Sequence, residues 1–220
     1  EGERVTLWVQ NSHPIPIPRG AIGLNLMGSD DIRWLDAEIP PFATRAIDVA
    51  TLLPEARWPQ QIEVQAGRHF VRPRYEVLGA DGRLRIAHAN VERNDLKPDP
   101  RIATLGERLG KGFILPAPIL PVADFGSLLQ PTPMSTAQSE LPIAAIVYDA
   151  SGHEVVRHRF GRLPRDLALE CDLAALAAQG GGLGAGYGHV ELVYDFAEGG
   201  EADGWLHALF RYSQKASGHI

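Results

Sequence analysis

The chain has 220 residues and carries 27 acidic against 21 basic side chains, for a net charge of −6 at pH 7. This balance argues against a general nucleic-acid binder, which usually has a basic surface, and no apolar run reaches the roughly 18 residues of a membrane helix. Hydrophobic residues make up 45% of the chain, enough for one large domain or two smaller modules. Its single cysteine, Cys171, excludes an intramolecular disulfide and is typical of a reducing compartment, so we expect a cytoplasmic protein.

Strand patterns dominate the first half of the chain. Alternating sequences with β-forming residues cover 5–10 and 32–39, and in 61–66 apolar and polar side chains occupy opposite faces. Residues 74–78 and the run that begins at Leu84 flank a Gly-containing turn, which predicts a hairpin.

The second half follows the same pattern. Residues 143–148 and 154–160 flank Asp149–Gly152, a strong hairpin signal, and two further strands are expected at 190–196 and 205–212. Helical patterns are short and follow an aspartate suited to helix capping in each half. Short strands punctuated by turns predict an all-β fold of two tandem antiparallel β-sandwich, Ig-like modules with a Pro-rich connector and few short helices.

The expected boundaries place a first module at 1–95 and a second at 141–220. The intervening residues 96–140 contain Leu115–Pro121 and Gln130–Met134, which are rich in proline and apolar. Because a flexible linker would be polar, we expect this connector to pack on the modules or on a partner subunit.

Two landmarks recur at nearly the same offset. Asp48 and Asp172 are 124 residues apart, and His88 and His207 are 119 residues apart. Such a recurring separation indicates duplicated modules, and it predicts that the two histidines occupy matching places on matching strands.

These repeated segments resemble the small β-sandwich modules of the sensory rhodopsin transducer family. The matching stretches are Pro41–Val49 with Ile86–His88, and Pro164–Leu173 with Trp205–His207. The resemblance implies a tandem, non-enzymatic sandwich that assembles with itself or with partners and can bind a small ligand. The duplication and the long connector depart from the family's pattern, so the identity of a partner does not transfer.

The candidate ligand-binding residues are the two histidines, polar residues that share their strand faces, and a loop tryptophan: His88, Asn90, Glu92, His207, Arg211 and Trp58. Strand alternation places the first three on one face and the next two on the equivalent face. Trp58 could stack on the apolar face of a sugar. Alternatively, the histidines serve the fold by bonding a neighbouring strand.

Catalytic patterns are weak in this sequence. There is no Gly-x-Ser-x-Gly, no His-Glu-x-x-His and no pair of cysteines. His189 and Glu191 share a strand face, and with His207 they could hold a metal ion.

The sequence therefore predicts a non-enzymatic binding or assembly protein without a cofactor, which recognises a partner protein or a carbohydrate-like ligand and forms a homo-oligomer or a complex with that partner. The alternative is a metal-dependent enzyme on the same β-sandwich scaffold that uses His189, Glu191 and His207. A purely structural assembly element is the third possibility.

Overall fold

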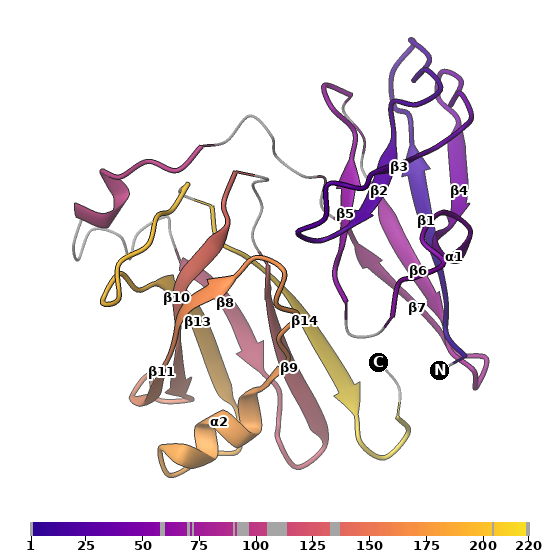
Figure 1. The fold of residues 1–220 in the computed structure, drawn as a ribbon. Coiled ribbons are helices and arrows are strands. Elements are labelled where there is room, and N and C mark those ends of the chain that lie inside the picture. Colours follow the sequence, from indigo (N-terminus) through magenta and orange to yellow (C-terminus); the bar gives the residue numbers. More distant parts are fainter. Residues whose placement is uncertain are drawn as a thin grey trace. The chain divides into compact units, whose positions relative to one another are not determined.

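The structure is a computed structural model that describes residues 2–57, 60–69, 71, 73–89, 91, 97–104, 114–132, 137–203 and 205–218. For His88 and Ile114 it describes the backbone alone. The described chain is mostly β, and its strands form four antiparallel sheets (Figure 1). The chain divides into two units, Glu1–Asn94 and Asp95–Ile220, with two sheets in each.

The first unit contains a four-stranded and a three-stranded sheet. The larger sheet has the order β4 (Thr44–Asp48), β1 (Arg4–Gln10), β6 (Arg74–Leu78), β7 (Leu84–His88). The smaller sheet has the order β3 (Arg33–Trp34), β2 (Gly23–Leu26), β5 (Ile62–Gln65). A single helical turn, α1 (Val49–Leu52), follows β4.

Both sheets of the first unit contribute to one hydrophobic core. Leu7 and Val9 of β1 are buried in the same cluster as Leu24 of β2 and Val64 of β5. Since successive side chains of a strand alternate between faces, this fixes which face of each sheet points outwards. On β1 the outward residues include Trp8.

The second unit is built in the same way. One sheet has the order β11 (Glu154–Pro164), β10 (Glu140–Asp149), β13 (Gly188–Tyr194), β8 (Ile114–Ile119). The other has the order β12 (Cys171–Asp172), β9 (Phe125–Thr132), β14 (His207–Gln214). The helix α2 (Leu173–Gln179) follows β12, and a short 3-10 helix, η1 (Ile102–Thr104), precedes β8.

The core of the second unit also joins both of its sheets. Ile143 of β10 and Leu192 of β13 cluster with Leu129 of β9 and Ala208 of β14. The helix α2 adds Leu173, which has no exposed surface.

The same pairing order occurs in both units. In the first unit β1 pairs with β4 and β6, β2 pairs with β3 and β5, and α1 follows β4. In the second unit β9 pairs with β12 and β14, β10 pairs with β11 and β13, and α2 follows β12. Each unit adds one strand of its own, β7 at the end of the first and β8 at the start of the second. The two helices also begin alike, because Asp48 and Asp172 cap α1 and α2 with nearly identical backbone angles.

The expected equivalence of His88 and His207 is wrong. His88 is in β7, the strand that the second unit lacks, whereas His207 is in β14, whose counterpart by pairing order is β6. A near-constant offset between two histidines therefore arose without a shared structural position. The residues 96–140 are also not a separate connector, because β8 and β9 are strands of the second unit.

Both predicted hairpins are confirmed. β6 pairs with β7 across the turn at Gly82, and β10 pairs with β11 across the turn at Gly152. Both glycines have a positive φ, 77° and 82°, a conformation that glycine adopts at little cost. The strands expected at 190–196 and 205–212 do form, as β13 and β14, but they belong to different sheets.

The polar face of β5 is buried. Glu63 accepts a hydrogen bond of 2.6 Å from the Asn25 amide of β2, and the Gln65 amide donates to Asn25 Oδ1 at 3.1 Å. The alternation of 61–66 predicts two different faces but does not predict that both are covered. Asn25, which lies among apolar residues of β2, is the one signal in the sequence of this buried cluster.

Candidate functional site

One exposed surface stands out in the first unit, on the outward face of the sheet β4-β1-β6-β7. We call it the Trp8 face and define it by Trp8, Arg74, Glu76, Leu84 and Ile86. The strand register places these residues on one side: Trp8 is opposite Arg74, Glu76 is opposite Ile86, and Leu84 is at the start of β7. The neighbours of Trp8 along β1, on the inward side, belong to the core.

The indole of Trp8 is held in place on this face. Its Nε1 donates a hydrogen bond of 3.2 Å to Glu76 Oε2 on the neighbouring strand. On the other side of β1 its register partner is Ala46, whose small side chain leaves the ring uncovered. Trp8 thus remains 36% exposed although it lies in the middle of a sheet.

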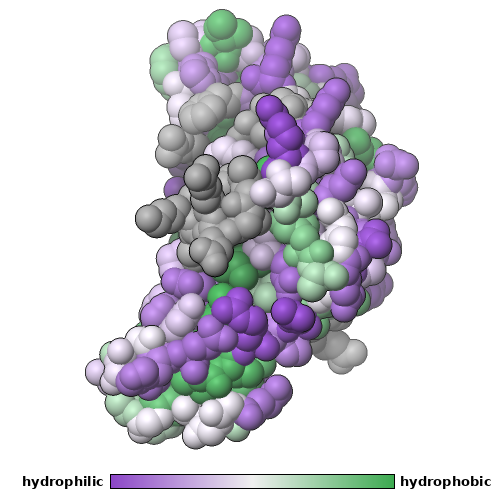
Figure 2. Space-filling model, turned by 90° about the vertical axis from the view of Figure 1, so that its left-hand side faces the viewer, coloured by the Kyte–Doolittle hydropathy of each residue, from purple (hydrophilic) through white to green (hydrophobic). Residues whose placement is uncertain are grey.

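The edge of the same face is apolar and more open. Leu84 is 49% exposed and Ile86 is 63% exposed. Figure 2 shows the side of the molecule on the left of Figure 1, where hydrophobic areas are bordered by hydrophilic ones and no single residue is labelled. Apolar surface of this kind marks interaction sites when several such residues lie together.

The residues predicted from the first half of the sequence fall only partly within the described chain. The backbone register places His88 opposite Arg74. Asn90, Glu92 and Trp58 lie outside the described residues.

The equivalent face of the second unit carries a larger share of polar side chains, beside Leu128 and Leu209. We call it the His207 face and define it by Gln130, Thr132, Glu170, His207 and Arg211. Thr132 Oγ1 and His207 Nδ1 are hydrogen-bonded across the β9–β14 pair. Further along, Glu170 accepts from Gln130 at 3.2 Å and lies 3.6 Å from Arg211 Nη1.

His207 and Arg211 share this face but do not meet. They are four residues apart on β14, which corresponds to about 13 Å along a strand, and Leu209 lies between them on the same side. His207 is hydrogen-bonded to Thr132 of β9, and Arg211 is paired with Glu170 of the segment before β12. The strand register places both residues on the outward side of the sheet, about 13 Å apart.

The three residues of the metal-dependent alternative point to opposite sides of the second unit. His189 and Glu191 lie on one face of β13, with 3.9 Å between Nε2 and Oε1, and the His189 ring stacks on Tyr148. The residues that alternate with them along β13 fill the core, so both point outwards from one sheet. His207 points outwards from the other sheet, because its neighbour Ala208 is in the same core.

The described part of the chain holds no group of three His, Cys, Asp or Glu side chains that could bind a metal ion. His189 and Glu191 therefore lack a third ligand from these residue types within it. Four-coordinate zinc sites take three or four protein ligands.

A buried polar cluster lies near the end of β13. Asp203 accepts from the backbone N–H of Trp205 at 2.9 Å, and the Arg165 guanidinium donates to the Gln138 carbonyl at 3.3 Å. Burial raises the pKa of the Asp203 carboxyl, which these hydrogen bonds and Arg165 partly oppose. Asp203 Oδ2 and Gln138 Oε1 are both buried side-chain oxygens of this cluster.

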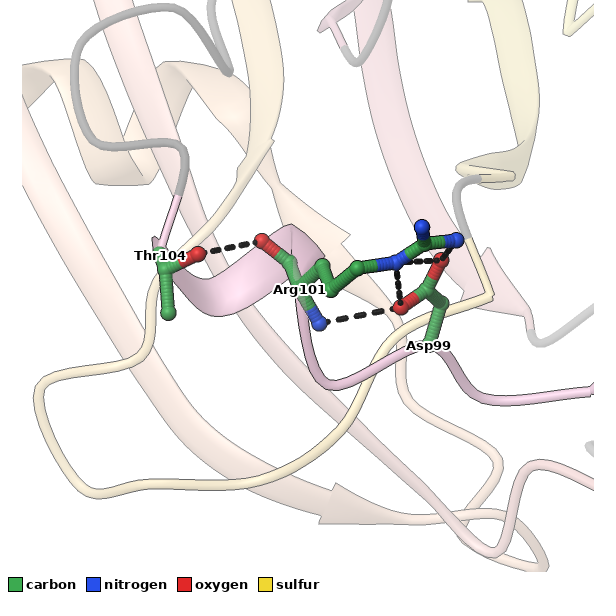
Figure 3. A network of polar contacts seen from close by, with 3 residues as sticks. All are labelled: Asp99, Arg101 and Thr104. Carbon is green, nitrogen blue, oxygen red and sulfur yellow. Dashed lines mark hydrogen bonds and ion pairs between the residues drawn. The ribbon is translucent and has the colours of Figure 1, made fainter.

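A further polar network lies at the start of the second unit (Figure 3). The Arg101 guanidinium forms a two-point contact with the Asp99 carboxylate, with Nη2 2.7 Å from Oδ2, and Thr104 Oγ1 donates to the Arg101 carbonyl. The side-chain hydrogen bonds from Arg101 lower the pKa of Asp99. Because Asp99 N–H also donates to the Ala202 carbonyl at 2.8 Å, the network attaches η1 to the second unit and has a structural role.

Comparison of the chain with known protein families, with curated proteins and with solved structures found no match. In the part of the chain that is described, no helix is both long enough and apolar enough to cross a membrane.

Sequence reasoning missed the Trp8 face. The residues of β1 and β7 alternate, and the alternation alone leaves open which set faces the core. The available signal was that Leu84 and Ile86 alternate with Arg85, while on β1 Trp8 alternates with Leu7 and Val9. Apolar residues thus occur on both faces of this sheet. A single core buries only one of these faces, so the apolar residues of the other face remain exposed.

Proposed function

We propose that this chain is a non-enzymatic binding protein that recognises an extended, apolar segment of a partner protein on the Trp8 face. The observation that carries the proposal is the joint exposure of Trp8, Leu84 and Ile86 on one sheet face. We also propose that each unit, with two sheets around one core, is a β-sandwich of the Ig-like kind.

The composition of the Trp8 face supports a protein as the ligand. Protein interfaces have apolar and aromatic residues at the centre, are enriched in Trp and Arg, and have a polar rim. Here Arg74 and Glu76 of β6, with opposite charges, lie between Trp8 of β1 and Ile86 of the edge strand β7. Apolar side chains that flank a mixed pair of charges favour a defined partner over an anionic surface.

The position of β7 supports an extended partner segment. β7 is an edge strand, and an incoming strand can add to such an edge through backbone hydrogen bonds, with side chains of alternate residues giving specificity. Leu84 and Ile86 would then contact alternate side chains of the bound segment.

Fewer features of the Trp8 face support a carbohydrate-like ligand. A sugar ring could stack on Trp8, but Leu84 and Ile86 offer it no side-chain hydrogen bonds. A glycan array is the corresponding test, and glycan binding that is lost in Trp8→Ala but retained in Ile86→Ser would favour the sugar over the protein segment.

The proposal is tested by selecting random peptides displayed on phage against the intact chain. We expect the selected peptides to carry apolar residues at alternate positions, and a fluorescence-polarisation titration to show binding at least about tenfold weaker to Ile86→Ser. Leu167→Ser is the matched control, because Leu167 is a comparably exposed leucine, at 46%, in the second unit.

The proposal fails if no peptide is enriched, or if the enriched peptides bind Ile86→Ser and Trp8→Ala as tightly as the unchanged chain. Circular dichroism of each variant shows whether it is folded, so loss of binding through unfolding is recognised.

A further inference from the structure

We propose that two copies of this chain pair antiparallel through their β7 strands, centred on Ile86, to form one continuous sheet. The inference rests on the proposed function and names its partner: the extended apolar segment that adds to the β7 edge of this sheet is β7 of a second copy.

The free edge of β7 is defined by its hydrogen bonds to β6. Gly79 N–H donates to the Arg83 carbonyl at 2.8 Å and Ala89 N–H donates to the Pro73 carbonyl at 3.3 Å. In an antiparallel pair, hydrogen-bonded and non-bonded residue pairs alternate, so Arg85 and Ala87 bond to β6. The backbone groups of Leu84, Ile86 and His88 therefore point to the open edge, where the described residues include no strand paired with β7 other than β6.

The same residues carry the outward side chains. Leu84 and Ile86 present both their unpaired backbone groups and their exposed aliphatic side chains at one edge. An incoming strand would bond to the backbone, and its own side chains on this face would pack beside those of Leu84 and Ile86.

Two other edge strands, β8 and β11, have features that discourage such pairing, whereas β7 and the edge strand β14 have regular registers and no proline. Of these two, β7 carries the exposed aliphatic side chains Leu84 and Ile86. β8 contains Pro116 and Pro118, which cannot donate backbone hydrogen bonds. β11 has two register irregularities along its pairing with β10, and charged side chains and bulges both discourage edge pairing. β7 has a regular register with β6 and contains neither proline nor lysine.

The sequence of β7 is complementary to itself. An antiparallel pairing centred on Ile86 places that residue opposite its own copy, Leu84 opposite His88, and Arg85 opposite Ala87. No two arginines are directly opposite, which matters because like charges at directly opposed positions destabilise a sheet. The arrangement is a two-fold symmetric contact, the commonest form of soluble homodimer.

The contact is small, so the dimer is expected to be weak. One pair of five-residue strands and a few side chains bury less surface than a standard protein interface, and such contacts are typically transient. Association is therefore expected to depend on concentration.

Sedimentation velocity of the intact chain over a range of concentrations tests the inference. We expect a monomer of 23.9 kDa at low concentration and a dimer at high concentration. Ile86→Lys and Ile86→Glu should each be monomeric throughout, because each places two like charges at the centre of the contact. Leu167→Lys, in the second unit, should dimerise like the unchanged chain.

Mixing the Ile86→Lys variant with the Ile86→Glu variant gives the sharpest result. Because Ile86 faces its own copy, the mixture would place a lysine opposite a glutamate and should restore dimers, with association about tenfold tighter than that of either variant alone. A tryptic and thermal comparison of the variants confirms that each is folded.

Three results would overturn the inference: a chain that stays monomeric at all concentrations, a dimer that survives Ile86→Lys, or a mixture that associates no better than its components. A monomeric chain that still binds the selected peptides through Ile86 would overturn the self-pairing and leave the proposed function standing. A monomeric chain for which no peptide is enriched would overturn both.

Discussion

Asp48 and Asp172 show at the scale of single residues how the sequence sets local structure. Each precedes a helix, and its carboxylate accepts hydrogen bonds from backbone N–H groups of the first turn: Ala50 for Asp48, and Ala174 and Ala175 for Asp172. These groups have no partner within the helix, which is why a short polar acceptor is favoured there.

Replacing Asp172 with alanine is expected to destabilise the protein by about 1 kcal/mol, the usual effect of removing such a cap. The loss matters because Leu173 and Leu176 of α2 belong to the core of the second unit. Urea unfolding followed by circular dichroism measures the change. Asp172→Asn keeps an acceptor and should lose clearly less, and equal losses in both variants would show that the cap is not the cause.

Cys171 provides a second prediction at this scale. Burial, together with the neighbouring Asp172 carboxylate, raises the pKa of its thiol to about 11. The thiol therefore stays protonated near pH 8, and only the thiolate is reactive. We expect slow reaction with Ellman's reagent in the folded protein at about pH 8 and fast reaction in denaturant. Equally fast reaction in both conditions would contradict a buried, protonated thiol.

At the scale of elements, close approach of backbones explains some glycines that propensity does not. A Cβ added at Gly188, at the start of β13, would lie 2.1 Å from the Tyr148 carbonyl oxygen of β10. Gly126 of β9 differs, since its nearest neighbour, at 2.8 Å, is the Ser213 hydroxyl, which can rotate away.

Gly188→Ala is expected to destabilise the protein by roughly 1–3 kcal/mol, because the β10–β13 pair must shift to admit the methyl group. Thermal unfolding of the variant measures this. Gly126→Ala is the matched strand control and should change the midpoint little, and a similar drop in both variants would show that any strand glycine has this effect and that the close approach at Gly188 is not its cause.

The strands and helices were easier to predict from this sequence than the pairing of the strands into sheets. The strand β1, both hairpins and the two capped helices follow from local alternation and turn residues, which depend on near neighbours. The pairing of β13 with β8 and β10, and of β14 with β9, depends on contacts distant in sequence, which local patterns do not encode. For the same reason His207 was matched to His88, and the Trp8 face, which spans β1, β6 and β7, was missed.

At the scale of the whole molecule, two units share one pairing order and each has its own core. Among the described residues, the cluster around Leu24 lies within the first unit and the cluster around Leu192 lies within the second. Each unit thus has what a domain needs to fold alone.

We therefore expect the fragments 1–94 and 95–220, expressed separately, each to show a cooperative thermal transition and dispersed NMR signals. A fragment that is unfolded in isolation would contradict the independence of its core.

We propose that the Trp8 face and the open edge of β7 form the recognition surface of this protein. Hydrogen–deuterium exchange of the intact chain tests this by comparing the free protein with the protein at dimer-forming concentration or saturated with a selected peptide. We expect the amides of Leu84 and Ile86 to exchange more slowly in the bound state, while those on the edge of β11 are unchanged. Equal exchange of the β7 amides in free and bound protein would contradict it.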